Sequence, residues 1–320
     1  MPATDPAVLS MGEPLIEFNA AAEGTLESST AFHIGFGGDT SNMAIAARRS
    51  GASTGYLTRV GDDAFGRALT ELWRREGVDT THVVTEPGGA TGIYFITRHG
   101  DGKHAFTYRR AGSPASRLSP PDVPEEAVAA ARLLHISGIT QAIGPSACDA
   151  AFHAMETARA YSTLVSYDPN HRPALWPVAR ARAVVMRSAE LADVVLPNLE
   201  EGRLLTGAHE PADVLAAFAA RGPAIVALKM GADGVLLGEE GRTVHVPAHR
   251  VVPTDATGAG DTFDGAFAAR LLDGDSPLEA ARYAVIAAAL TTTGHGAVGP
   301  IPHRDAVLDA GGLRDFEDTA

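Results

Sequence analysis

The chain has 320 residues, a formal net charge of −13, 45% hydrophobic residues and 20% charged residues. This composition is typical of a soluble globular protein with a large core, whereas the negative charge argues against a nucleic-acid or anionic-membrane surface. Any phosphate site therefore needs a local cluster of donors, and the single cysteine, Cys148, excludes an internal disulfide and indicates a reducing compartment.

Short apolar runs alternate with helical patterns along the chain, which is typical of βαβ units and a parallel sheet. We predict core strands, in chain order, at 8–12, 54–61, 132–138, 163–168, 193–198 and 224–231. We predict helices at 40–50, 65–76, 146–161, 211–221, 259–272 and 277–293, with a hairpin at 235–248. The predicted fold class is therefore α/β. No basic segment precedes an apolar run near the amino terminus, so we expect a cytoplasmic protein without a signal peptide.

Two stretches, 14–36 and 90–110, instead alternate apolar and polar residues around glycine turns. This pattern is typical of antiparallel strands with one solvated face, and it makes 99–102 a hairpin turn. We expect the two stretches to form a small β-sheet lid over the mouth of the parallel sheet, where a lid can exclude water from a reacting site. Residues 1–13, 37–89 and 111–320 would then form the core.

The run TDATGAGDTFDGAF, which starts at residue 254, carries the most chemical information. Gly258, Ala259 and Gly260 let the first N–H groups of an amphipathic helix approach a ligand closely, and the helix dipole favours an anion there. Asp261 adds a carboxylate beside this anion hole, which is useful if it takes the proton of a hydroxyl that attacks a phosphate. From these residues alone, the alternative is a glycine-rich helix start with an acid in its first turn.

The same run resembles the carboxy-terminal signature of the ribokinase-like (PfkB) carbohydrate kinases, and GFGGDTSNMAIAARRSGASTGYLTRVGDDAFG at 35–66 resembles their amino-terminal signature. The resemblance runs from about residue 10 to 305. It implies a three-layer α/β/α core with a mostly parallel central sheet and a β-sheet lid. It also implies Asp261 as general base, ATP with Mg²⁺ as phosphate donor, and a monovalent cation such as K⁺ near the anion hole.

The resemblance further assigns nucleotide and metal positions. PNLEE looks like the family's Asn-x-x-Glu motif, in which Asn198 faces the phosphates and Glu201 holds Mg²⁺ through waters. The alternative is that Asn198 only caps a helix. The other assigned positions are Lys229, Gly231, Gly258 and Gly260 for the nucleotide, and Asp255 and Thr257 for the monovalent cation.

The acceptor is predicted from two further segments. FTYRRAGSPASRL resembles the lid strand of 2-keto-3-deoxygluconate kinases and places Tyr108 and Arg110 on one face of a strand. Arg110 can bind a carboxylate bidentately, which a neutral sugar does not require. SYDPNHRPALWP resembles a second segment of that subgroup and adds Arg172. The remaining predicted acceptor contacts are Gly38, Asp39, Asn42, Tyr94 and Asp261.

Several of these positions also have a purely structural interpretation. Arg110 could guard an edge strand, Arg172 could pair with a surface acid, and Tyr94 could belong to the core of the lid. We nevertheless predict an ATP-dependent kinase, expected to be a homodimer, that phosphorylates the terminal hydroxyl of 2-keto-3-deoxygluconate or a near relative.

Three alternatives remain open. A fructokinase or another neutral-sugar kinase would present Glu17 to sugar hydroxyls, and truncation of Arg110 would barely affect it. A nucleotide-binding protein without turnover would not need Asp261. A Rossmann dehydrogenase would need a Gly-x-Gly-x-x-Gly spacing that GFGGDT lacks.

Overall fold

A computed structural model describes residues 6–98 and 104–312. Within these residues the main sheet has nine strands in the order β13-β12-β11-β10-β9-β8-β1-β4-β5, and it is parallel except at the β12–β13 hairpin and its pairing with β11. The strands are β1 (Val8–Met11), β4 (Thr54–Gly61), β5 (Val83–Glu86), β8 (Leu133–Ser137), β9 (Leu164–Asp168), β10 (Val194–Val195), β11 (Ile225–Lys229), β12 (Val235–Glu239) and β13 (Arg242–Val246).

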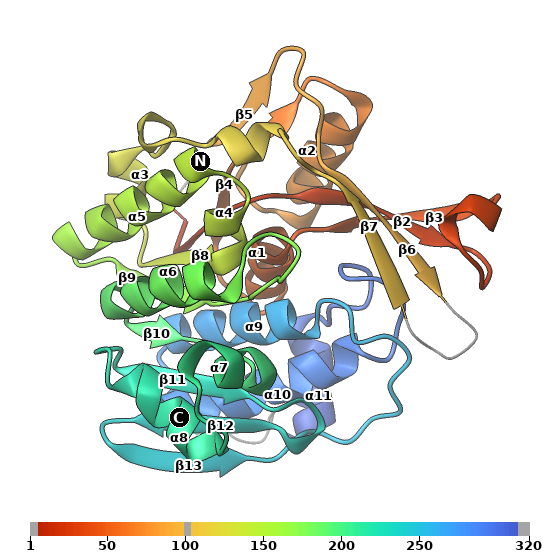
Figure 1. Ribbon diagram of the computed structural model, residues 1–320. Helices are drawn as coiled ribbons and strands as arrows, with labels where there is room; N and C mark the ends of the chain where they lie inside the picture. Colours follow the sequence, from red (N-terminus) through yellow and green to blue (C-terminus); the bar gives the residue numbers. More distant parts are fainter. Residues whose placement is uncertain (1–5, 99–103, 313–320) are drawn as a thin grey trace.

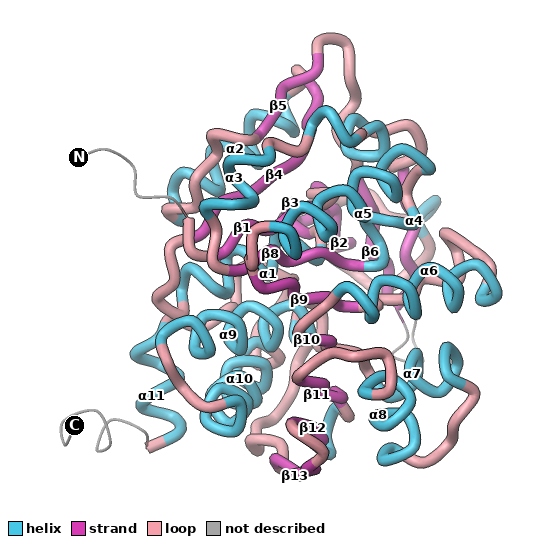
Figure 2. Tube along the Cα trace, turned by 90° about the vertical axis from the view of Figure 1, so that its left-hand side faces the viewer, coloured by secondary structure: helices cyan, strands magenta, loops and turns pink. Residues whose placement is uncertain are grey.

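Helices cover both faces of the main sheet, which gives the predicted three layers. The α-helices are α1 (Asp39–Arg49), α2 (Ala64–Glu76), α3 (Glu125–Ala130), α4 (Gly138–Ala142), α5 (Pro145–Ala160), α6 (Val178–Leu191), α7 (Leu199–Thr206), α8 (Pro211–Ala219), α9 (Ala259–Asp273), α10 (Pro277–Thr291) and α11 (Arg304–Gly311). Helices α5 to α8 lie on one face, and α9, α10 and α11 lie on the other (Figure 2). None of the helices in the described part of the chain is long and apolar enough to cross a membrane.

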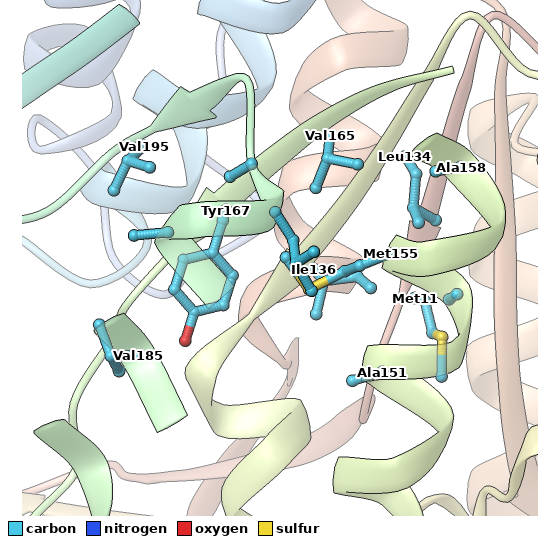
Figure 3. Close-up of a cluster of buried hydrophobic side chains, with 14 of the residues drawn as sticks. Met11, Leu134, Ile136, Ala151, Met155, Ala158, Val165, Tyr167, Val185 and Val195 are labelled. Carbon is cyan, nitrogen blue, oxygen red and sulfur yellow. The ribbon is translucent and has the colours of Figure 1, made fainter. Parts of the chain in front are cut away.

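The largest buried cluster fills the space between the central strands and the helices α5 and α6 (Figure 3). Strands that are covered on both faces are apolar at successive positions, which explains the continuous runs in the sequence. The labelled members of this cluster from strands β1, β8, β9 and β10 are Met11, Leu134, Ile136, Val165, Tyr167 and Val195, and those from helices α5 and α6 are Ala151, Met155, Ala158 and Val185.

The second sheet is small and extends away from the core (Figure 1). Its order is β3-β2-β6-β7, with β2 (Leu15–Ala20), β3 (Phe32–Gly37), β6 (Ile93–Arg98) and β7 (His104–Arg109). The predicted antiparallel strands are confirmed within each insertion, where β2 pairs with β3 and β6 with β7. Between the insertions, β2 and β6 pair in parallel, because each is the outgoing strand of its own insertion. The predicted turn at 99–102 lies outside the described residues. On this sheet Ile34 is 66% exposed and Phe106 is 46% exposed. The homodimer remains a prediction.

Two other differences from the predicted elements have local causes. Strand β10 has only two residues because Pro197 cannot donate to a neighbouring strand. The sequence patterns did not predict β5, α3, α4, α6, α7 and α11. Strand β5 lies at the edge of the sheet and its Val84 is exposed, so its sequence lacks the apolar run of a central strand.

Candidate active site

A cavity of about 1100 Å³ opens where the parallel strands end and the small sheet begins. Asp168 and Lys229 are the last residues of β9 and β11, and Asn198 follows β10. The carboxyl ends of parallel strands are the usual ligand site of an open α/β sheet. The predicted site residues that line the cavity are Gly38, Asp39, Asn42, Tyr94, Tyr108, Arg110, Arg172, Asn198, Lys229, Gly231, Asp255, Thr257, Gly258, Gly260 and Asp261. Two predicted site residues do not line the cavity: Ala259, which lies between the lining residues Gly258 and Gly260, and Glu201, which lies in the helix that begins after Asn198.

The amino terminus of α9 points its first turn at this cavity. Gly258 caps the helix with φ of 77°, and a Cβ there would lie 2.8 Å from the carbonyl oxygen of Ala297. Both the backbone conformation and the close approach therefore require glycine. The N–H of Ala259 donates to the oxygen of Ala256 at 3.3 Å, whereas helix geometry leaves the next two N–H groups without an intrahelical acceptor. These two N–H groups and the helix dipole form a site for an anion.

Asp261 stands in that first turn, and Asn42 of α1 donates to its Oδ2 at 2.8 Å. Burial, together with the nearby charge of Asp39, raises the pKa of Asp261 to about 7, while the bond from Asn42 opposes the shift. A carboxylate whose pKa lies near neutral pH is well suited to accept a proton during a reaction.

The bond from Asn42 leads to a pH prediction. The bond stabilises the charged form of Asp261, so Asn42→Ala should raise the pKa of this candidate base. If Asp261 is the base, the rise of kcat/KM with pH moves to higher pH. The variant loses more activity at pH 6 than at pH 8.5, measured as a pH profile of turnover. Ser41→Ala is the control, because the Ser41 hydroxyl bonds to Trp73 instead, and its profile keeps the original inflection. An unchanged inflection in Asn42→Ala would contradict the assignment.

Two unpaired acceptor atoms line the cavity from α1, the helix that packs against α9. Asn170 donates to Oδ2 of Asp39 at 2.9 Å, but Oδ1 of Asp39 is buried without a hydrogen-bond partner in the described structure, and so is Oδ1 of Asn42. Buried polar atoms are nearly always hydrogen-bonded in folded proteins. The two oxygens are therefore suited to accept hydrogen bonds from the hydroxyl groups of a ligand.

Arg110 does not lie on the surface. Its side chain is 9% exposed, its Nε donates to Oε2 of Glu13 at 2.6 Å, and its Nη2 forms an ion pair with the same oxygen. The guanidinium lies over the ring of Tyr108, 5.4 Å from the centroid. The edge-strand interpretation of Arg110 is therefore wrong, and the exposed arginine of the pair is Arg109. Burial raises the pKa of Glu13 above its usual value, and the contact with Arg110 opposes that shift.

Arg172 and Tyr94 are two further predicted acceptor contacts that line the cavity. Nη1 of Arg172 donates to the backbone oxygen of His171 at 3.3 Å, and no acid among the described residues lies within ion-pair distance of Arg172. Tyr94 is buried, stacks on Tyr108 with the ring centroids 5.6 Å apart, and donates its hydroxyl to Glu17 at 2.5 Å. Tyr94 thus belongs to the packing of the small sheet and also lines the cavity.

Lys229 lies in a buried ionic cluster that the sequence patterns did not predict. Its Nζ lies 2.9 Å from Oδ1 of Asp264 in α9 and 3.3 Å from Oδ2 of Asp168. Desolvation opposes the charge, yet the two carboxylates raise the pKa of Lys229 above its usual value. The ammonium is thereby fixed between the ends of two strands and the helix that carries Asp261.

Asn198 and Glu201 form a capping box at the start of α7. Asn198 accepts from the N–H of Glu201 at 2.9 Å, and Glu201 accepts from the N–H groups of Asn198 and His171, each at 2.7 Å. The helix-capping interpretation of Asn198 is thus realised. Burial and the nearby charge of Asp168 raise the pKa of Glu201 to about 7. Within residues 6–98 and 104–312, no group of three or more His, Cys, Asp or Glu side chains could hold a metal ion.

The loop before α9 is fixed by Asp255. Its Oδ1 accepts from the N–H and hydroxyl of Thr257 at 2.9 and 2.6 Å, and its Oδ2 accepts from the N–H of Gly296 at 2.9 Å. Asp255 therefore ties the loop that leads into α9 to the loop after α10.

Comparison with known proteins agrees with this architecture. Residues 5–304 match the pfkB family of carbohydrate kinases. The chain is 36% identical to a 2-dehydro-3-deoxygluconokinase of Thermoproteus tenax over 89% of this chain and 87% of that protein, and 34% identical to fructokinase-1 of Zea mays over 94% and 96%. A structure of fructokinase from Vibrio cholerae O395 with fructose, ADP and a calcium ion is 28% identical, with a TM-score of 0.83 over 96% of this chain and 99% of that one. The chain belongs to the pfkB family of carbohydrate kinases.

Proposed function

We propose that the protein transfers the γ-phosphate of ATP to the terminal hydroxyl of 2-keto-3-deoxygluconate or a closely related sugar acid. One observation carries the proposal: a single cavity combines a helix amino terminus, an aspartate whose pKa is about 7, and two arginines, Arg110 and Arg172. The first two groups suit phosphoryl transfer to a hydroxyl, and the arginines suit an acceptor that carries a carboxylate.

The residues of the cavity have distinct tasks in this reaction. Asp261 takes the proton as the acceptor hydroxyl forms a bond to phosphorus and the bond to the leaving ADP oxygen breaks. The N–H groups of Gly260 and Asp261 stabilise the charge on the transferred phosphate, whereas the predicted contribution of Ala259 is opposed by the bond of its N–H to Ala256. Asp39 and Asn42 accept hydrogen bonds from the acceptor's hydroxyls through their unpaired oxygens. The small sheet acts as a lid, because Tyr94 and Tyr108 close the cavity on one side.

The nucleotide would lie along the strand ends, against Asn198, Lys229 and Gly231. Glu201 would hold Mg²⁺ through waters, and the ion would neutralise part of the charge on the phosphates. Glu201 already accepts the N–H groups of Asn198 and His171, so it is suited to contact a largely hydrated magnesium ion through waters. A cation nearby would favour the charged form of Glu201. Asp255 and Thr257 are the proposed holders of a monovalent cation such as K⁺.

A neutral-sugar kinase is the second candidate, and one contact favours it. Arg110 is already paired with Glu13, so its charge is compensated before any substrate binds. However, Glu17, which a fructokinase would present to the sugar, is buried and accepts the hydroxyl of Tyr94. The chain also resembles fructokinases and 2-dehydro-3-deoxygluconokinases at similar identity, so the choice depends on the arginines.

Arg172 offers the cleanest test of the acid-sugar proposal, because its truncation leaves no buried acid unpaired among the described residues. We expect Arg172→Met to lower kcat/KM for 2-keto-3-deoxygluconate about 10- to 100-fold, since a hydrogen bond to a charged group contributes roughly 1.5–3 kcal/mol. Use of fructose, if any is detected, should change little. Steady-state kinetics with each sugar measures both values.

Arg109→Met is the matched control, because it removes the same charge from an exposed side chain next to the cavity. It should leave kcat/KM for the sugar acid within about twofold, as expected for an exposed charge. Equal losses for the sugar acid and a neutral sugar in Arg172→Met would sink the carboxylate assignment and leave the kinase assignment in place.

A further inference from the structure

Glu13 lies where the connections between the main sheet and the small sheet converge. The chain crosses between the sheets near residues 13, 38, 92 and 112, and Glu13 occupies the first crossing. At the second crossing, Gly38 has φ of 101°, and a Cβ on it would lie 2.4 Å from the backbone oxygen of Glu13. At the third, a Cβ on Gly92 would lie 3.1 Å from Oε1 of Glu13. At the fourth, the Ser113 hydroxyl donates to that same Oε1 at 2.5 Å.

The other carboxylate oxygen of Glu13 holds Arg110. Oε2 accepts from Nε at 2.6 Å and pairs with Nη2, so one edge of the planar guanidinium is occupied. Among the described residues no acceptor bonds to Nη1, and Arg110 lines the cavity with Tyr108 packed against its guanidinium. The free edge is therefore the one that a ligand in the cavity can reach.

We infer that Glu13 is a positioning residue for acceptor recognition: it fixes Arg110 at the junction of the two sheets so that only the Nη1 edge is presented to the acceptor's carboxylate. This inference rests on the proposed function, since it requires Arg110 to bind the acceptor. Glu13 also lines the cavity, but its side chain is 1% exposed and both its carboxylate oxygens already bond to Arg110 or Ser113, so it acts through Arg110.

The physical basis is preorganisation. A free arginine side chain loses rotamer freedom when it binds a ligand, whereas an arginine fixed by a buried carboxylate has lost that freedom during folding. A displacement of about 1 Å in a positioning group can lower activity about 100-fold. The position of the Glu13 carboxylate therefore matters more than its charge.

Two conservative variants separate position from charge. Glu13→Gln keeps the length of the side chain, so it can accept from Arg110 through one atom and donate to Ser113 through the other. Glu13→Asp keeps the charge but withdraws the carboxylate by one methylene. We expect Glu13→Asp to raise KM for 2-keto-3-deoxygluconate about tenfold, with KM for ATP and kcat changed little, and Glu13→Gln to stay within about threefold of the original KM. The opposite order, with Gln impaired and Asp normal, would overturn the positioning role in favour of charge compensation.

A double-variant cycle with Arg110→Met distinguishes this inference from the proposed function. If Glu13 acts through Arg110, Glu13→Asp adds nothing to the KM for the sugar acid once Arg110→Met is present. If Arg110→Met raises that KM and Glu13→Asp raises it further by its full factor, the inference fails while the acceptor assignment stands. If Arg110→Met leaves the KM unchanged, Arg110 does not bind the acceptor, and both are overturned. Unfolding midpoints of all variants identify any that are merely unfolded.

Discussion

Asp261→Asn should lower kcat about 10²- to 10⁴-fold while KM for ATP changes little, because a neutral amide cannot take the proton of the acceptor hydroxyl. Asparagine has the same shape as aspartate and can still receive the hydrogen bond from Asn42 at 2.8 Å. The start of α9 should therefore stay in place, and the loss should appear in turnover. Steady-state kinetics with ATP and the preferred sugar measures the effect.

Asp273→Asn provides the matched control at the other end of α9, where the side chain is 51% exposed and pairs with Arg270. It carries the same chemical change on the same helix, and it should leave kcat unchanged. Near-normal turnover in Asp261→Asn would show that Asp261 is not the base, and the cavity would then need another proton acceptor.

Lys229→Met should lower the free energy of unfolding by about 3–5 kcal/mol, because it leaves the buried carboxylates of Asp264 and Asp168 without their partner. The Asp264 side chain is 1% exposed and does not line the cavity, so little water reaches it to replace the lost contact. Urea unfolding without ligands measures the change.

Arg67→Met is the corresponding control on the surface, where Arg67 and Asp62 are 67% and 59% exposed and lie 3.4 Å apart. Its stability should change by no more than about 0.5 kcal/mol. The double variant Lys229→Met with Asp264→Leu should recover part of the loss, because it removes one of the two stranded charges. A Lys229→Met protein as stable as the original chain would mean that the cluster is not held by its charges.

The sequence allowed most of the core to be predicted because its strands are buried on both faces. Strands β4, β8 and β9 are buried at nearly every position and carry apolar residues on both faces, and amphipathic helices lie between them. Strand β5 and helix α3 could not be predicted in this way, since β5 is a partly exposed edge strand and α3 has only six residues. The parallel pairing of β2 with β6 joins segments more than 70 residues apart, so no local pattern predicts it.

In the candidate site, too, residues that lie together in the sequence could be predicted, whereas contacts between distant residues could not. Asp261 and the glycine-rich start of α9 lie together in the sequence, so a single motif predicts them, and the structure places both at the cavity. The ion pair between Glu13 and Arg110 and the bond from Asn42 to Asp261 connect residues that are 97 and 219 positions apart. The family resemblance assigned Lys229 to the nucleotide, and Asp168 ends a predicted core strand, but the pairing of the two residues depends on the order of the strands in the sheet.

The identity of the acceptor is tested most directly by ADP release with ATP, Mg²⁺ and K⁺, comparing 2-keto-3-deoxygluconate, fructose, ribose and gluconate at matched concentrations. The arginines Arg110 and Arg172 predict a large preference for the keto-deoxy acid in kcat/KM. A preference for fructose or ribose would contradict the acid-sugar proposal while leaving Asp261 as the base of a neutral-sugar kinase. No release with any of the four would contradict the proposed acceptor class and favour a nucleotide-binding protein or an acceptor of different chemistry.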